Sequence, residues 1–223
     1  RSRRAGEADS EGVRRVFREF ADLAAIGTIA DVMPLTDENR LIVACGLSMI
    51  EKTKRPGLCA LLDAVQSGQN TRGADGGQTT HKKRRINAGF IGFGIAPRIN
   101  AAGRMAHADI AAKLFLTSDR NRADELAARL CEINRERQVE ENRTAEEAMA
   151  KIEAERDGDR DRVVVVASDG WKQGIIGIVA SRVVEKYGMP AILITFEGCH
   201  RDGDDADPDP SDIGKGSGRS VKG

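Results

Sequence analysis

Residues 163–196 read VVVVASDGWKQGIIGIVASRVVEKYGMPAILITF, and this stretch decides the fold class. The apolar run Val163–Ala167 is typical of a buried parallel strand. Ile175–Tyr187 follows as an apolar helical segment, with Gly188 as its predicted C-cap. Ala191–Phe196 then predicts a second strand. A strand–helix–strand unit favours a parallel sheet, and therefore an α/β fold.

Helical spacing dominates the chain that precedes this unit. Apolar residues recur at helical intervals within residues 13–35, and a second helix is expected over about 38–53. Residues 118–156 are also helical in pattern. One continuous helix of roughly 55 Å and two helices with a break near 137–143 both agree with that pattern.

Composition excludes several classes of protein. The length of 223 residues suits one or two domains. The chain has 35 basic and 35 acidic side chains, which excludes a uniformly basic nucleic-acid coat but allows a local basic groove. No apolar run approaches the roughly 18 to 20 residues of a membrane span. The four cysteines lack CxxC spacing, which disfavours a zinc site or a disulfide scaffold and favours a reduced, cytosolic compartment.

Two segments have the composition of insertions. Residues 67–85 are polar and glycine-rich and end in four basic residues, so we expect a solvated loop, with an electrostatic arm for phosphates as the alternative. Residues 199–212 hold six aspartates and two prolines, which predicts a disordered insertion. The chain starts at Arg1 and ends at Gly223, and we expect both ends to be edges within a longer protein.

Two aspartates, Asp22 and Asp31, stand in the otherwise apolar stretch DLAAIGTIADVMPL. Burying a carboxylate is costly unless it is paired or bound to a metal, and carboxylate oxygens suit magnesium or manganese. The alternative is structural: Asp22 caps a helix and Asp31 starts a turn.

Two arginines and an asparagine are concentrated within residues 98–104, RINAAGR. Small residues let a polyanion approach, and arginine binds a phosphate in a bidentate manner. A buried turn with structural ion pairs is the alternative. The residues before this motif, 86–97, alternate only weakly between faces.

Two glycine-rich segments are predicted anion sites. Gly214–Ser220 reads GKGSGRS, where glycines admit a ligand to the backbone and the polar side chains offer donors, although it is not a Walker loop. A flexible tail is the alternative. Residues 170–174, GWKQG, precede a predicted helix, where an anion would be favoured. Tight packing through these glycines is the alternative there.

Taken together and in order, five segments resemble the RecJ family of single-stranded-DNA-specific exonucleases, within the DHH phosphoesterase superfamily. The segments read DLAAIGTIADVMPL, GFGIAPRINAAGRM, INRERQ, GWKQGIIGIVASRVVEKY and GKGSGRS. They extend over about residues 20–223, apart from the two insertions. The resemblance implies three parts: the end of a DHH catalytic lobe (1–36), a helical connector with the RINAAGR motif (37–156), and a DHH-associated nucleic-acid-binding lobe with a mostly parallel sheet (157–223).

The resemblance also assigns roles to individual residues. Asp22 matches the metal-binding aspartate of the family's fourth motif, and is expected to be catalytic, with Mn²⁺ or Mg²⁺ activating water for phosphodiester hydrolysis. Most other metal ligands of the family lie upstream of this chain. By resemblance, Arg98, Asn100 and Arg104 match the motif that faces the substrate strand, and Ser217 and Arg219 match the second-lobe loop that grips the 5′ phosphate. Lys172 and Gly218 complete the residues expected to bind the substrate.

The implied function is 5′-to-3′ exonuclease action on single-stranded DNA, in repair and recombination, with a helicase and a single-strand-binding protein as partners. We expect this chain by itself to be nearly inactive, because one aspartate cannot hold a catalytic metal. Lys172 stands where the family usually has histidine, and the acidic insertion before residue 214 would repel DNA. The alternatives are a DHH-family phosphodiesterase for oligonucleotides or cyclic dinucleotides, and a non-catalytic single-strand-binding module.

Overall fold

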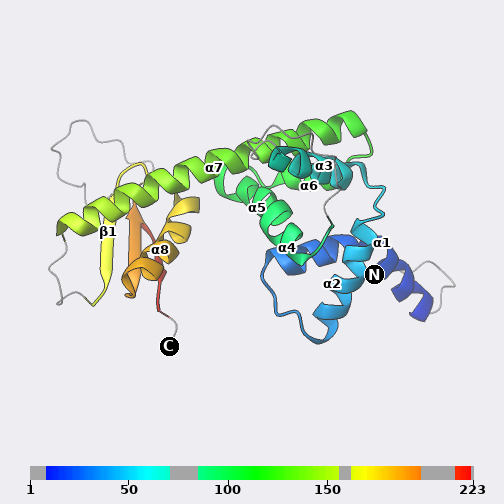
Figure 1. Ribbon diagram of the computed structural model, residues 1–223, viewed down its shortest axis with the longest axis horizontal. Helices are drawn as coiled ribbons and strands as arrows, with labels where there is room; N and C mark the ends of the chain where they lie inside the picture. Colours follow the sequence, from blue (N-terminus) through cyan, green and yellow to red (C-terminus); the bar gives the residue numbers. More distant parts are fainter. Residues whose placement is uncertain (1–8, 71–84, 156–161, 197–213, 222–223) are drawn as a thin grey trace. The chain divides into compact units, whose positions relative to one another are not determined.

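A computed structural model describes residues 9–70, 85–155, 162–196 and 214–221 (Figure 1). Most of the two predicted insertions therefore lies outside the described residues. The chain forms two compact units, which we call unit 1 (Arg1–Asn134) and unit 2 (Arg135–Gly223). The boundary falls inside the predicted connector, and the assignment of the parts to family lobes stays a prediction. None of the described helices has the length and apolar character to cross a membrane.

Among the described residues of unit 1, the regular elements are all helices. Its elements are α1 (Asp9–Ala30), α2 (Asp37–Ile50), α3 (Pro56–Asn70), α4 (Ala88–Phe90), the π-helix η1 (Ile91–Ile95), α5 (Ala96–Met105), α6 (Asp109–Leu116) and the first part of α7 (Arg120–Glu155). The predicted helix over about 38–53 is confirmed as α2. Pro56 begins the next helix, where its missing N–H costs nothing.

Two glycines allow the helices of unit 1 to pack closely. A Cβ on Gly46 of α2 would lie 2.3 Å from the Cβ of Ala25 on α1, and a Cβ on Gly57 of α3 would lie 1.8 Å from the carbonyl oxygen of Leu114 on α6. Both helix pairs therefore need glycine at the contact. The fully buried large side chains of the core between these helices are Ile50, Leu58, Leu61, Ile91, Ile95, Leu114 and Leu130.

The weak alternation in residues 86–97 does not produce a strand. Asn87 caps α4 by accepting a hydrogen bond from the N–H of Phe90 (2.8 Å), and η1 and α5 continue the helical path. The buried residues here are Phe90, Ile91, Gly94, Ile95 and Ala96. Their spacing follows the turn of a helix, and this tertiary burial outweighs the local alternation.

Helix α7 is continuous for 36 residues, which settles the open question of a break near 137–143. Arg137 and Glu141 form an ion pair of 2.7 Å across that interval, with both side chains 14% exposed. Arg122 pairs with Glu125 in the same manner nearer the start of the helix. Such i,i+3 and i,i+4 pairs support helix in a polar sequence.

Unit 2 contains a three-stranded sheet in the order β1–β2–β3, with α8 packed on β2 and β3. The elements are β1 (Val164–Ser168), α8 (Gln173–Tyr187), β2 (Ala191–Thr195) and β3 (Lys215–Arg219). The predicted strand–helix–strand unit is confirmed, because β1 and β2 are parallel, and Gly188 ends α8 with a left-handed φ of 66°.

The third strand corrects one expectation. Gly214–Ser220 was expected to be a glycine-rich loop, yet Lys215–Arg219 pairs antiparallel with β2. The α/β class is confirmed, and the described sheet is mixed, with one parallel and one antiparallel pair. Pairing with β2 satisfies backbone groups that a loop would leave to a ligand or to water, which explains why a sequence poor in strand formers is extended here.

Candidate functional site

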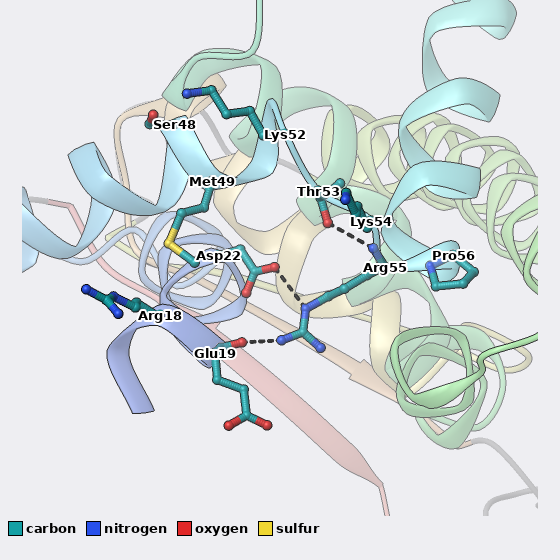
Figure 2. A pocket seen from close by; sticks show the side chains of 10 residues that line it. All are labelled: Arg18, Glu19, Asp22, Ser48, Met49, Lys52, Thr53, Lys54, Arg55 and Pro56. Carbon is teal, nitrogen blue, oxygen red and sulfur yellow. Dashed lines mark hydrogen bonds and ion pairs between the residues drawn. The ribbon is translucent and has the colours of Figure 1, made fainter. Parts of the chain in front are cut away.

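Asp22 lies within α1 and is almost fully buried, with 4% of the residue exposed. Its Oδ1 accepts a hydrogen bond from the N–H of Leu23 (2.8 Å), and its Oδ2 accepts one from Nε of Arg55 (2.9 Å). Arg55 also donates through Nη2 to the carbonyl oxygen of Glu19 (Figure 2). A buried carboxylate is costly without a partner, so the ion pair with Arg55 offsets the cost of burying Asp22 in α1.

Sequence reasoning missed Arg55. The residue closes the run EKTKR (Glu51–Arg55) immediately before α3, and its N–H donates to the Oγ1 of Thr53 (3.2 Å). A cationic run at the end of the predicted helix over about 38–53 was the available signal. It did not identify Asp22 as the partner, because the two residues are 33 positions apart.

A cavity of about 680 Å³ opens beside this ion pair (Figure 2). Four of the lining residues are basic and two are acidic, so its wall carries a net positive charge. This balance suits an anionic ligand better than a bare cation. The lining residues are Arg18, Glu19, Asp22, Ser48, Met49, Lys52, Thr53, Lys54, Arg55 and Pro56.

A divalent metal ion does not fit the described residues by themselves. Asp31 is exposed in the turn that follows α1, and across the described ranges no three histidine, cysteine, aspartate or glutamate side chains are grouped to hold a metal. Mg²⁺ and Mn²⁺ need several oxygen ligands. Both oxygens of Asp22 already accept hydrogen bonds. The role of Asp22 as a metal ligand therefore stays a prediction.

The RINAAGR motif divides between two environments. Asn100, Gly103 and Arg104 are exposed on α5 at spacings of three and four residues, which places them on one face of the helix. Arg98 is half-buried instead. Its Nε donates to the Sγ of Cys131 on α7 (3.3 Å), and its Nη1 donates to the carbonyl oxygen of Gly94. The structure thus gives Arg98 a packing role, whereas Asn100 and Arg104 are exposed to solvent.

Successive side chains of β3 point to opposite faces of the sheet. Ser217 pairs with Leu193 in the register, and Leu193 is buried on the side of the sheet that α8 covers. Ser217 and Arg219 therefore lie on the α8 face. Gly218 pairs with Ile192, so the place of its missing side chain is on the opposite face. The contribution of Gly218 is its backbone, whose carbonyl oxygen accepts a hydrogen bond from Nη1 of Arg219 (2.7 Å).

Lys172 is the residue immediately before α8, and a buried contact connects its loop to β2. The Oγ1 of Thr195 donates to the carbonyl oxygen of Trp171, and both residues are fully buried. Thr195 is also the strand partner of Lys215. Lys172 and Lys215 consequently approach the same end of the sheet, next to the α8 face that carries Ser217. Sequence reasoning did not place Lys215 with Lys172, because only the strand pairing brings them together.

A polar cluster supports this loop from the side of α7. Lys151 Nζ donates to Ser168 Oγ (3.0 Å), and Ser168 Oγ donates to Oε1 of Glu147 (2.6 Å). Lys151 Nζ also lies 5.7 Å from the ring centroid of Trp171, within cation–π range. Burial acts to raise the pKa of Glu147, but the bond from Ser168 and the charge of Lys151 outweigh it, so the pKa is lowered. The cluster holds Ser168 and Trp171, and thereby the position of Lys172.

No family model matches the chain. The single-stranded-DNA-specific exonuclease RecJ of Bacillus subtilis is 38% identical over 205 residues, which are 92% of this chain and 23% of that protein. The Escherichia coli RecJ is 33% identical over 209 residues, which are 92% of this chain and 32% of that protein. The chain thus spans only a quarter to a third of the length of these curated relatives.

Solved structures give the same relationship in three dimensions. The crystal structure of RecJ from Thermus thermophilus with Mn²⁺ superposes with a TM-score of 0.63 at 36% identity, covering 80% of this chain and 24% of that one. The corresponding structure with Mg²⁺ gives 0.64 at 35% identity, covering 80% and 25%. A third, of exonuclease RecJ bound to manganese, gives 0.63 at 35% identity, covering 80% and 40%.

Proposed function

Because this chain is homologous to part of the RecJ single-stranded-DNA-specific exonucleases, we propose that it contributes the strand-holding part of such an enzyme. The substrate is single-stranded DNA with a 5′ end, and the reaction is hydrolysis of a phosphodiester bond from that end. Action in DNA repair and recombination, a cytoplasmic location, and helicase and single-strand-binding partners belong to the same proposal.

The observation that carries the proposal is the placement of Ser217 and Arg219. Both side chains lie on the α8 face of β3, and Nη1 of Arg219 lies 3.3 Å from Oγ of Ser217. A hydroxyl and a guanidinium side by side offer a terminal phosphate both neutral and charge-assisted donors. Lys172 and Lys215 add positive charge at the neighbouring end of the sheet. In unit 1, the exposed Asn100–Arg104 face of α5 offers donors to further phosphates of the strand.

Metal-dependent cleavage needs more than the described residues supply. The RecJ structures with Mn²⁺ and Mg²⁺ support these ions as the cofactor of the family reaction. Asp22 would give one carboxylate, and Arg55 would have to release or share it. We therefore propose that this chain binds a single strand and does not hydrolyse it at an enzymatic rate. Non-catalytic single-strand binding is the second function, and the Asp22–Arg55 ion pair favours it.

The test measures binding of one single-stranded oligonucleotide carrying either a 5′ phosphate or a 5′ hydroxyl, at low salt because phosphate contacts weaken as salt rises. The wild type is expected to prefer the phosphate, and Arg219→Ala is expected to lose that preference. Arg104→Ala is expected to weaken the binding of both oligonucleotides equally. A wild type that binds neither, or both equally, would contradict the proposed phosphate site. Rapid degradation of the strand with Mn²⁺ would contradict the proposed inactivity.

A further inference from the structure

Gly177 lies directly beside the two side chains that form the proposed phosphate site. A Cβ built on Gly177 would lie 3.0 Å from Oγ of Ser217 and 3.1 Å from Nη2 of Arg219. Both separations are tighter than an ordinary carbon contact of about 3.5 to 4.0 Å. Gly177 belongs to the second turn of α8, so the helix presents bare backbone where β3 carries its hydroxyl and guanidinium.

Arg219 uses this space because of how its side chain folds. Nη1 is engaged by Oγ of Ser217 (3.3 Å) and by the carbonyl oxygen of Gly218 (2.7 Å), so the guanidinium turns back along β3. In that position Nη2 lies over Gly177. A methyl group at residue 177 would press on Nη2 and on Oγ of Ser217, which must give way by a few tenths of an ångström, and the exposed end of Arg219 is the part that is free to move.

The helix itself gives no reason for a glycine at this position. Gly177 has ordinary helical backbone, and glycine is a poorer helix former than alanine. The atoms that an added Cβ would meet first belong to polar side chains, one of them the far end of an arginine. Replacing Gly177 by alanine therefore displaces the guanidinium without disturbing the core of unit 2.

We propose that Gly177 is a positioning residue for the 5′-phosphate site: its missing side chain lets Arg219 lie against Ser217 so that both meet one phosphate. The inference rests on the proposed function and specifies a third residue of the same site. It accounts for a glycine within an otherwise apolar helix by a requirement of the neighbouring strand.

The experiment compares the ratio of the two dissociation constants, for the 5′-hydroxyl and 5′-phosphate oligonucleotides, among variants of the full chain. Gly177→Ala is expected to lower this preference by about two- to tenfold, the scale of one weakened hydrogen bond, with a urea midpoint no lower than that of the wild type. In the Arg219→Ala background, Gly177→Ala is expected to leave the remaining affinity for the 5′-phosphate oligonucleotide unchanged, because its effect acts through the guanidinium. A purely structural role would lower the urea midpoint and would also lower the affinity that remains in Arg219→Ala.

Ser181→Ala is the matched control on the same helix. Its Oγ donates to the carbonyl oxygen of Gly177 (3.3 Å), so the variant perturbs the same turn without adding an atom beside Arg219. It is expected to keep the phosphate preference. If Arg219→Ala loses the preference while Gly177→Ala keeps it, the inference is wrong and the proposed function stands. If the wild type has no preference, the phosphate site itself is wrong.

Discussion

Arg55 Nε lies 2.9 Å from Oδ2 of Asp22, and this contact joins α1 to the residue before α3. The two partners differ in their access to water. The side chain of Asp22 is 6% exposed, whereas that of Arg55 is 30% exposed. Left without its partner, Arg55 can turn toward solvent, but Asp22 stays buried with a negative charge. The two halves of this ion pair should therefore respond differently to removal.

Arg55→Ala is expected to lower the free energy of unfolding by about 2 to 3 kcal/mol, because it leaves a buried carboxylate without its charged partner. Asp22→Asn is expected to cost less, about 1 kcal/mol, because the amide oxygen still accepts from Leu23 and Arg55 is solvated. Urea denaturation of the two variants, followed by circular dichroism, measures both values.

The double variant Asp22→Asn/Arg55→Ala is the control for coupling. With no buried charge left, it should cost less than the sum of the two single variants. Equal costs for the single variants, or a double variant that simply adds them, would contradict the assignment of the penalty to an unpaired Asp22.

Val32, two residues after the end of α1, has a backbone conformation that favours glycine. Its φ is 54°, and the N–H groups of Val32 and Met33 donate to the carbonyl oxygens of Ile29 and Thr28 (both 3.1 Å). This is a Schellman motif, in which the left-handed residue is usually glycine. A β-branched side chain is strained there. Val32→Gly is therefore expected to raise the free energy of unfolding by about 1 kcal/mol, as measured by urea denaturation.

Met33→Gly is the comparison for this prediction. Met33 has no left-handed backbone to relieve, so glycine there only increases the freedom of the unfolded chain and should destabilise. A loss of stability in Val32→Gly as large as that in Met33→Gly would show that the positive φ carries no strain.

Local patterns predicted much of the fold. The apolar run before Gly170, the apolar helical segment that forms α8 and the Gly188 cap are signals within a few residues of one another, and all three are confirmed. Strand β3 was missed because its sequence, KGSGR, has little strand propensity and is held by pairing with β2. The local pattern also did not predict the helical segment from α4 to α5, because burial against other helices outweighs the weak alternation of residues 86–97.

The candidate site depended still more on distant contacts. Arg98 and Arg104 belong to one motif, yet only the packing against Cys131 reveals that Arg98 faces inward. The pairing of Asp22 with Arg55 likewise depends on how α1 packs against α2, because Arg55 lies in the loop that follows α2. No spacing rule connects Gly177 with Arg219, because a helix and a strand meet there through tertiary structure. Sequence can indicate residue types that suit a phosphate, while their common face follows from the fold.

The polar cluster around Glu147 predicts a pH dependence of stability. The pKa of Glu147 lies below its ordinary value of 4.5, so folding favours the carboxylate. This contribution is fully present above pH 4.5 and is lost as the pH falls through the lower, folded-state pKa. Glu147→Gln is expected to be less stable than the wild type at pH 7, and the difference should shrink below pH 4.5. Urea denaturation at several pH values measures it.

Glu146→Gln provides the matched control, because Glu146 is the exposed neighbour on the same helix. Its stability should follow that of the wild type at each pH. A difference between Glu147→Gln and wild type that stayed constant down to pH 3 would mean that the lost side-chain packing, and not the ionised carboxylate, explains the variant.

Substitutions of the two arginines of the RINAAGR motif should differ in their effects, one lowering stability and the other lowering DNA binding. Arg98 bonds to Cys131 and to the carbonyl oxygen of Gly94, so Arg98→Ala is expected to lower the free energy of unfolding by about 1 to 2 kcal/mol. Arg104 is exposed on α5, so Arg104→Ala should change stability by less than about 0.5 kcal/mol.

For binding of a single strand, we expect Arg104→Ala to have the larger effect and Arg98→Ala the smaller one. Each phosphate contact contributes about 0.7 to the slope of log affinity against log salt for single strands, so Arg104→Ala is expected to reduce that slope by about this amount. Arg98→Ala should leave the slope unchanged wherever the chain is folded, because its guanidinium is engaged within the protein. Titrations at several salt concentrations, on variants whose folding has been checked, measure both slopes. A reduced slope for Arg98→Ala, with none for Arg104→Ala, would place the DNA on the opposite side of α5.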